Sequence, residues 1–243
     1  MLTIFLTAVL IISEAPLLAA SPIRQEAAGN EVLERYLALS ESQKQYLRGA
    51  EMEVDIVGTL PAVNKSGKLR AFRYISKLGE ITYRVITFQG DNTVKKDVIA
   101  RYMSAETEAV KHPGLGVTAQ NYRFKHYGVH GSGDWKLHVF RVTPRKKSQG
   151  LFEGLIWIHE RTALPVREQG RLVKSPSVFL KRVAFVRDYR IQDGFAIPSH
   201  VTSSIETRII GRAELEITFK NFNRQASANA GDQQVASLTG GGF

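Results

Sequence analysis

The pattern of apolar and polar positions predicts one long amphipathic helix near the N-terminus. Over residues 26–47, apolar residues recur at helical spacing on one side, and charged residues occupy the other side. The apolar side consists of Val32, Leu33, Tyr36, Leu37 and Leu39. Asn30 is a candidate N-cap, and Gly49 closes the segment. We therefore expect a helix that packs its apolar side against a sheet.

After Gly49 the period of the pattern changes to two. The apolar residues Met52, Val54 and Ile56 alternate with three acidic residues, which predicts a half-buried strand. Further strands are predicted over residues 69–78, 81–88, 121–131, 135–143, 154–159, 178–189, 201–209 and 213–219. The last two of these show the clearest alternation and predict a hairpin around Gly211.

Residues 94–109 and the Pro113-Gly114 loop interrupt this strand pattern, and residues 95–105 predict a second helix on or over the sheet. Strands and helices do not alternate regularly, which argues against a parallel α/β sheet. Consecutive strands at short spacing predict a mainly β (α+β) fold, with a closed or partly closed antiparallel sheet and one or two helices against it.

The two ends of the chain differ from its body. Residues 1–20 contain an apolar run, Leu2–Ile12, followed by small residues, which is typical of a signal peptide and too short for a membrane span. No Lys or Arg precedes the run and Glu14 interrupts its tail, so a short membrane-surface or buried helix stays open as an alternative. Residues 224–243 contain almost no large apolar side chains and predict a flexible tail. We expect one folded domain over residues 26–222 and a periplasmic location.

Composition limits the chemistry and the partners. The absence of cysteine excludes disulfides, thiolate catalysis, cysteine-bound metals and a lipidated cysteine anchor. The net charge of +10, from 33 Lys and Arg against 23 Asp and Glu, favours anionic partners, although a merely well-solvated basic surface remains open. The charge is spread along the chain and forms no stripe, which argues against nucleic acid.

Histidines are the first candidates for a metal site. Four of the six lie on or beside the predicted hairpin: His126, His130, His138 and His159. A two-residue turn at Ser132-Gly133 pairs His126 with Val139 and sends His138 to the opposite face. This register gathers Tyr122, Phe124, Trp135 and Leu137 on one side. We therefore expect no metal site, although facing histidines would permit one.

No catalytic motif stands out in the sequence. It contains no Gly-x-Ser-x-Gly elbow, no His-Glu-x-x-His and no phosphate-binding loop. Gly114-Leu115-Gly116 lacks the rest of a dinucleotide fingerprint, and Glu51 and Glu53 alternate with apolar residues and are expected to face water. We expect a protein that is not an enzyme and has no cofactor. Residues 154–158 are apolar on both strand faces, so one face lines either a cavity or the underside of a helix.

The C-terminal half resembles the LolA-like outer-membrane lipoprotein-sorting family. The resemblance rests on residues 154–159, 164–167, 186–189, 194–199 and 218–222. They match a family pattern of the type W-I-D-x-x-x-x-x-P-x-R, followed by Y-x-x-x-x-G-x-x-x-P and a last strand that ends near an aromatic residue. His159 stands where the family often has aspartate, and we expect it to cap a turn. The resemblance covers most of residues 30–222.

The resemblance implies a half-open antiparallel β barrel whose concave apolar face is covered by helices and holds acyl chains. Acyl chains in such a cavity gain about 0.8 kcal/mol per buried methylene. We expect a periplasmic carrier for lipid or lipoprotein acyl chains. Candidate cavity or lid residues, each of which could instead be plain core, are Val32, Tyr36, Tyr83, Val85, Ile156, Ile158, Phe185, Ile205, Leu215, Ile217 and Phe219.

Two other functions remain open. A basic β domain could bind an acidic envelope polymer or an anionic membrane surface through its charges, and its affinity would then fall steeply with salt. An outer-membrane biogenesis subunit would act through contacts with an envelope receptor or another protein.

Overall fold

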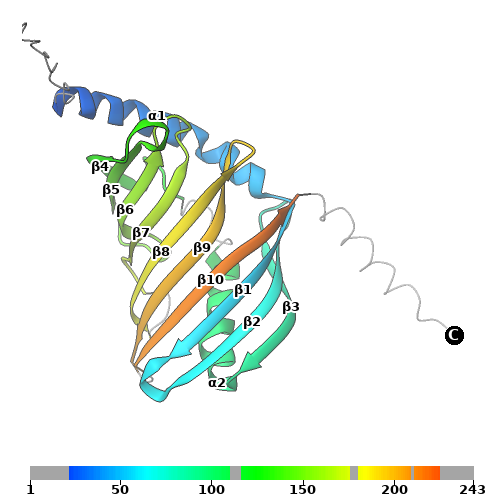
Figure 1. The fold of residues 1–243 in the computed structure, drawn as a ribbon. Helices are drawn as coiled ribbons and strands as arrows, with labels where there is room; N and C mark the ends of the chain where they lie inside the picture. The colour runs from blue at the N-terminus through cyan, green and yellow to red at the C-terminus, as the bar shows by residue number, and fades with distance from the viewer. Residues whose placement is uncertain (1–21, 110–115, 176–179, 209–210, 225–243) are drawn as a thin grey trace, which may run out of the picture.

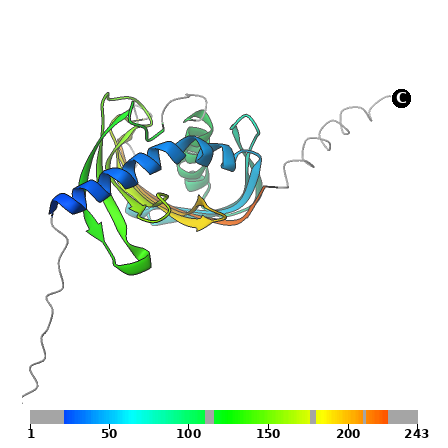
Figure 2. The same ribbon diagram turned by 90° about the horizontal axis from the view of Figure 1, so that it is seen from above.

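The computed structural model describes residues 22–109, 116–175, 180–208 and 211–224, with side chains from Glu26 onward. Ten strands form one antiparallel sheet in the order β3-β2-β1-β10-β9-β8-β7-β6-β5-β4. They are β1 (Ala50–Leu60), β2 (Lys65–Ile75), β3 (Ile81–Gly90), β4 (Tyr122–His130), β5 (Leu137–Pro144), β6 (Phe152–His159), β7 (Pro165–Leu172), β8 (Leu180–Gln192), β9 (Phe195–Thr207) and β10 (Arg212–Asn223). The sheet curls into a trough, as Figure 1 and Figure 2 show. In the described part of the chain its edge strands β3 and β4 do not pair, so the mainly β, half-open fold is confirmed and the barrel is not closed.

Helices cover the concave side of the trough. Helix α1 (Pro22–Leu47) crosses its open side, and α3 (Ala100–Ala109) stands inside it (Figure 2). Helix α3 continues α2 (Asn92–Val94) through a π-helical turn, η2 (Lys95–Ile99), so the predicted second helix is confirmed. The Asp91 carboxylate accepts a hydrogen bond of 2.7 Å from the Thr93 N–H and caps this segment. Two short 3₁₀ turns, η1 (Pro61–Val63) and η3 (Gly133–Trp135), complete the elements.

Two separate hydrophobic cores lie under the two helical segments. Beneath α2–α3, the inward side chains of β1, β2 and β10 pack on Val98 and Ile99. Beneath α1, Val32 and Tyr36 pack on Phe140, Ile156 and their neighbours on β4–β6. The middle of the concave face, on β7–β9, lies between these two cores.

Strand β7 is the element that the sequence did not predict. Its outward residues Arg167 and Arg171 are exposed, and its inward residues include Glu168 and Gly170, so it carries little apolar signal. Strand β9 also begins earlier than expected, at Phe195, because the Asp193-Gly194 turn joins it directly to β8. Both turn residues have positive φ, 53° and 77°, as a two-residue type I′ hairpin turn requires.

The predicted register of the β4–β5 hairpin is wrong. His126 pairs with Phe140, not with Val139, because residues 131–136 form a longer connection than the expected two-residue turn and a bulge lies between His126 and Gly128. A shift of one residue moves a side chain to the other face of a strand, so His126 and His138 share one face. The expected cluster of Trp135 with Tyr122 does not form either, since Trp135 lies in the turn and is 70% exposed.

The expected signal peptide (residues 1–20) and nearly all of the expected tail (residues 224–243) lie outside the described residues. Among the residues that are described, no helix combines the length and apolar character that a membrane crossing needs.

Candidate functional site

A cavity of about 890 Å³ separates the two helical segments from the middle of the sheet. Its walls come from α1, from η2 and α3, and from the concave face of β7–β10. Most of the lining side chains are apolar, among them Leu39, Leu47, Val98, Phe152, Phe185 and Ile205. Lys44, Lys96 and Arg101 also belong to the lining and are exposed, so the cavity reaches the surface at this rim.

Strand β8 shows why the cavity exists. It lies in the middle of the ten-stranded sheet, yet its inward residues Val183, Phe185 and Arg187 are only half-buried. A filled core would bury such central positions fully, as it does for Ile56 on β1 and Ile156 on β6. Neither helical segment packs directly onto this strip, so a space remains between the strip and the helices.

The structure brings four of the predicted cavity residues to this cavity: Tyr36, Phe185, Ile205 and Leu215. Five others are packed in the two cores and do not line it: Val32, Ile156, Ile158, Ile217 and Phe219. Tyr83 packs beside α3 at the end of the first core, where its hydroxyl donates to Glu106. Val85, on the edge strand β3, is 50% exposed and lies away from the lining.

A charged group lies inside the cavity and was not predicted. Arg187 on β8 donates from Nη1 to Oε2 of Glu168 on β7 at 3.0 Å, and to the Tyr189 hydroxyl at 3.4 Å. Burial raises the pKa of the Tyr189 hydroxyl and of Tyr36 across the cavity, so both stay neutral donors. The sequence contained an indication of this group, because Arg187 and Tyr189 lie on the same strand face as Phe185, which was predicted to line a cavity.

A second buried ion pair attaches α3 to the sheet. Arg73 on β2 donates to both carboxylate oxygens of Glu106, at 2.9 and 3.3 Å. Burial alone would raise the pKa of the Glu106 carboxyl, but Arg73 and the Tyr83 hydroxyl hold it below its usual range. Glu106 is therefore charged at neutral pH, and the pair fixes one wall of the cavity.

Helix α1 is held at two places. Near its C-terminal end, the Gln43 amide donates to the Ala196 carbonyl at 2.7 Å and accepts from the Ala196 N–H at 2.9 Å. Beside it, the ring of Tyr46 stacks on Phe195 with centroids 3.6 Å apart. Further towards the N-terminus, Arg35 donates to backbone carbonyls of the β6–β7 turn. Between these attachments α1 forms the roof of the cavity.

Two histidines and a glutamate, His126, His138 and Glu160, form a hydrogen-bonded chain. His126 Nε2 lies 3.1 Å from His138 Nδ1, and His138 Nε2 lies 2.9 Å from Oε2 of Glu160. Lys136 donates to the same carboxylate at 2.7 Å. Both nitrogens of His138 are thus engaged by side chains, and no group of three or more potential metal ligands occurs among the described residues. His159 acts as expected, because its Nδ1 accepts from the Thr162 N–H at 3.3 Å and caps the β6–β7 turn.

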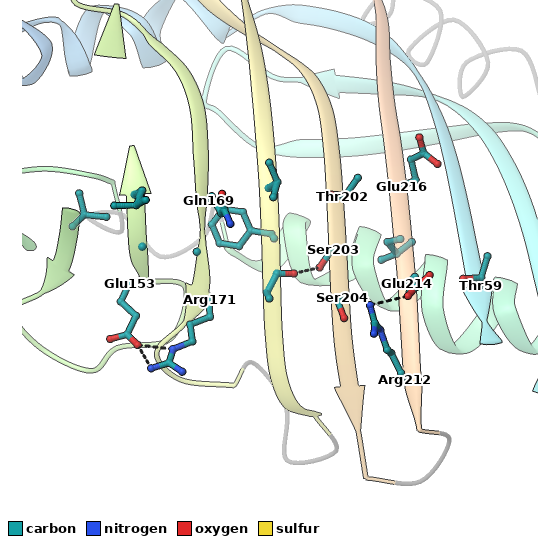
Figure 3. A pocket seen from close by; sticks show the side chains of 18 of the residues that line it. Thr59, Glu153, Gln169, Arg171, Thr202, Ser203, Ser204, Arg212, Glu214 and Glu216 are labelled. Atoms are coloured by element: carbon teal, nitrogen blue, oxygen red, sulfur yellow. Dashed lines mark hydrogen bonds and ion pairs between the residues drawn. The ribbon is translucent and has the colours of Figure 1, made fainter. Parts of the chain in front are cut away.

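A second hollow, of about 870 Å³, lies on the outer face of the sheet (Figure 3). Most of its side chains lie on the strand face opposite the inner cavity, and they include polar and charged groups such as Thr202, Glu214 and Glu216. Arg212 donates to Glu214 at 2.9 Å, and Arg171 pairs with Glu153, as Figure 3 shows. Because these charges already satisfy one another, this hollow makes a weaker candidate for a binding site than the inner cavity.

No model of a known protein family and no curated protein matches the sequence. Solved structures of similar fold include three with TM-scores of 0.38 to 0.43. One is a LolA superfamily protein from Nitrosomonas europaea, 10% identical with a TM-score of 0.41, over 80% of this chain and 92% of that one. Another is a DUF1329 family protein from Desulfovibrio piger, 11% identical with a TM-score of 0.43, over 83% and 93%. The third is a domain assigned to outer membrane lipoprotein sorting from Vibrio parahaemolyticus, 11% identical with a TM-score of 0.38, over 86% and 97%. These three likenesses concern the fold alone, at sequence identities of 10–11%.

Proposed function

We propose that this protein is a non-enzymatic carrier that holds the acyl chains of a lipid or lipoprotein in the cavity under α1. The observation that supports this most is the apolar strip of β8 and β9, left half-buried in the middle of a sheet whose two ends are fully packed. The apolar N-terminal run supports export to the periplasm as part of the same proposal.

The size of the cavity suits this cargo. A volume of about 890 Å³ is at the upper end of the range of about 300–1,000 Å³ in which small-molecule sites fall. Ten buried methylenes would contribute about 8 kcal/mol before the costs of association are subtracted. An affinity in the micromolar range or weaker follows, which allows a carrier to take up its cargo and release it.

Filling the cavity with a bulky side chain tests the proposal. Ser203 lies on β9 among the lining residues, and Ser203→Trp would occupy space that a chain needs. Val85→Trp is the matched control, because Val85 is half exposed on β3 and lies away from the cavity. We expect the uncharged fluorescent probe N-phenyl-1-naphthylamine to bind the wild type and Val85→Trp alike, and Ser203→Trp at least tenfold more weakly. Equal binding by all three proteins, or none by the wild type, would contradict the proposal.

The alternative of a charge-driven envelope binder predicts a different result. Its binding would fall steeply between low and high salt, whereas uptake of an uncharged probe into an apolar cavity would not.

A further inference from the structure

Arg187 offers unused hydrogen-bond donors to the inside of the cavity. Only its Nη1 has hydrogen-bond partners among the described residues, namely Glu168 and Tyr189, which leaves Nε and Nη2 available. The Arg187 side chain is 42% exposed although it lies deep in the molecule, because it lines the cavity. A purely hydrocarbon cargo would leave these donors facing apolar groups, which costs free energy. The cavity is therefore suited to a cargo with an oxygen acceptor at its inner end.

The charges around Arg187 favour an acceptor that carries no charge. Two arginines, Arg73 and Arg187, are already matched by two carboxylates, Glu106 and Glu168. Glu168 is 7% exposed and only 3.0 Å from Arg187, so its charge is not screened by bulk water. A carboxylate or phosphate placed at Arg187 would be a third anion against two cations in a poorly solvated space. An ester or amide carbonyl would use the free donors without adding charge.

The positive charges at the rim of the cavity would favour a cargo whose head group lies at the mouth and not at Arg187. Lys44, Lys96 and Arg101 are exposed there and would attract an anionic head group to the mouth. Lys44 and Arg101 already face Glu41 and Asp97, at 3.6 and 3.2 Å, and exposed charges of this kind are screened by salt. The Arg187 donors lie inside the cavity beside the buried Glu168 and are screened less, so they give the stronger recognition.

We propose that the cargo is an uncharged amphiphile of the acylglycerol type, bound with an ester or amide carbonyl oxygen on the free donors of Arg187. This inference rests on the proposed carrier function and adds the head-group chemistry and its orientation. Glu168 acts through Arg187: its carboxylate holds the Arg187 guanidinium in place and neutralises the positive charge that would otherwise select an anionic cargo.

Two ligands with the same chain provide the test: 1-monooleoylglycerol and oleate, each used to displace N-phenyl-1-naphthylamine at physiological salt. We expect the wild type to bind monooleoylglycerol at least tenfold more tightly than oleate. The double variant Glu168→Gln/Arg187→Met removes both charges at similar volume, and we expect it to weaken monooleoylglycerol binding at least tenfold more than probe binding. Arg182→Met, an exposed arginine on the same strand, is the matched control and should behave as the wild type.

The single variant Glu168→Gln separates neutral from anionic cargo most clearly, because it leaves the positive charge of Arg187 without its carboxylate partner. We expect its affinity for oleate to rise at least tenfold over that of the wild type. Tighter oleate binding by the wild type, or monooleoylglycerol binding that is indifferent to the double variant, would overturn the inference and leave the carrier function standing. Failure of the wild type to bind the naphthylamine probe would overturn both.

Discussion

The attachment of α1 to the β8–β9 turn makes a specific prediction about how the cavity opens. In Gln43→Ala, the N–H and C=O of Ala196 lose both partners. Ala196 is 1% exposed, so water cannot replace the lost bonds while α1 stays docked. Two hydrogen bonds and the buried groups that they satisfy correspond to about 2 to 4 kcal/mol. The C-terminal half of α1 should therefore undock about 30 to 700 times more often.

Hydrogen exchange measured by mass spectrometry reports this opening directly. We expect faster exchange of the backbone amides of residues 40–47 in Gln43→Ala, and little change in β1 or β10. Gln45→Ala is a matched control, because the exposed Gln45 side chain donates to Glu41 within α1 itself, at 3.1 Å. Equal exchange rates in Gln43→Ala and Gln45→Ala would mean that other contacts hold α1 in place.

Three further predictions concern the stability of the fold. Glu106→Gln leaves the buried Arg73 without its charged partner and should lower the free energy of unfolding, measured in urea, by about 3 kcal/mol. The control Glu214→Gln removes an exposed ion pair and should change this free energy by less than about 0.5 kcal/mol. Burial and the neighbouring histidine hold the pKa of His126 below 6.5, so its contribution to stability is present above pH 6.5 and is lost as the pH falls through the folded-state value. In His126→Gln the melting temperature should therefore depend less on pH below pH 6.5, and an unchanged dependence on pH would contradict this. Gly154→Ala would put a methyl group 1.9 Å from a backbone oxygen of β7 and should lower the stability of the fold by about 3 kcal/mol. Gly194→Ala has open space around it but a φ of 77°, and should lower the stability by about 1 kcal/mol. Equal losses of stability in thermal unfolding would contradict this difference.

The sequence predicts the type of fold well because most strands have one apolar and one polar face. The alternation of Met52, Val54 and Ile56 indicates a strand because these side chains enter the first core. The same rule fails for β7, whose inward Glu168 lies in the cavity and pairs with an arginine. A strand that lines a polar part of a binding site does not carry the apolar signal of a strand that covers a core.

Register and cavity lining depend on tertiary structure that local patterns do not contain. The bulge beside Gly128 brings His126 onto the face of His138, and no alternation rule anticipates one extra residue. Apolar residues on a concave face look alike in sequence whether they enter a core or a cavity. Leu215 and Ile217, two residues apart on β10, both pack in the first core, but only Leu215 also lines the cavity.

The proposal that the cavity under α1 holds acyl chains can be tested on the native protein. Native mass spectrometry of the protein purified from an envelope fraction, combined with organic extraction, detects a bound cargo. We expect a lipid or acyl species at a near-stoichiometric amount in the wild type and its loss in Ser203→Trp. A wild-type protein that carries no lipid and takes up none when mixed with monooleoylglycerol would rule out a carrier of acyl chains.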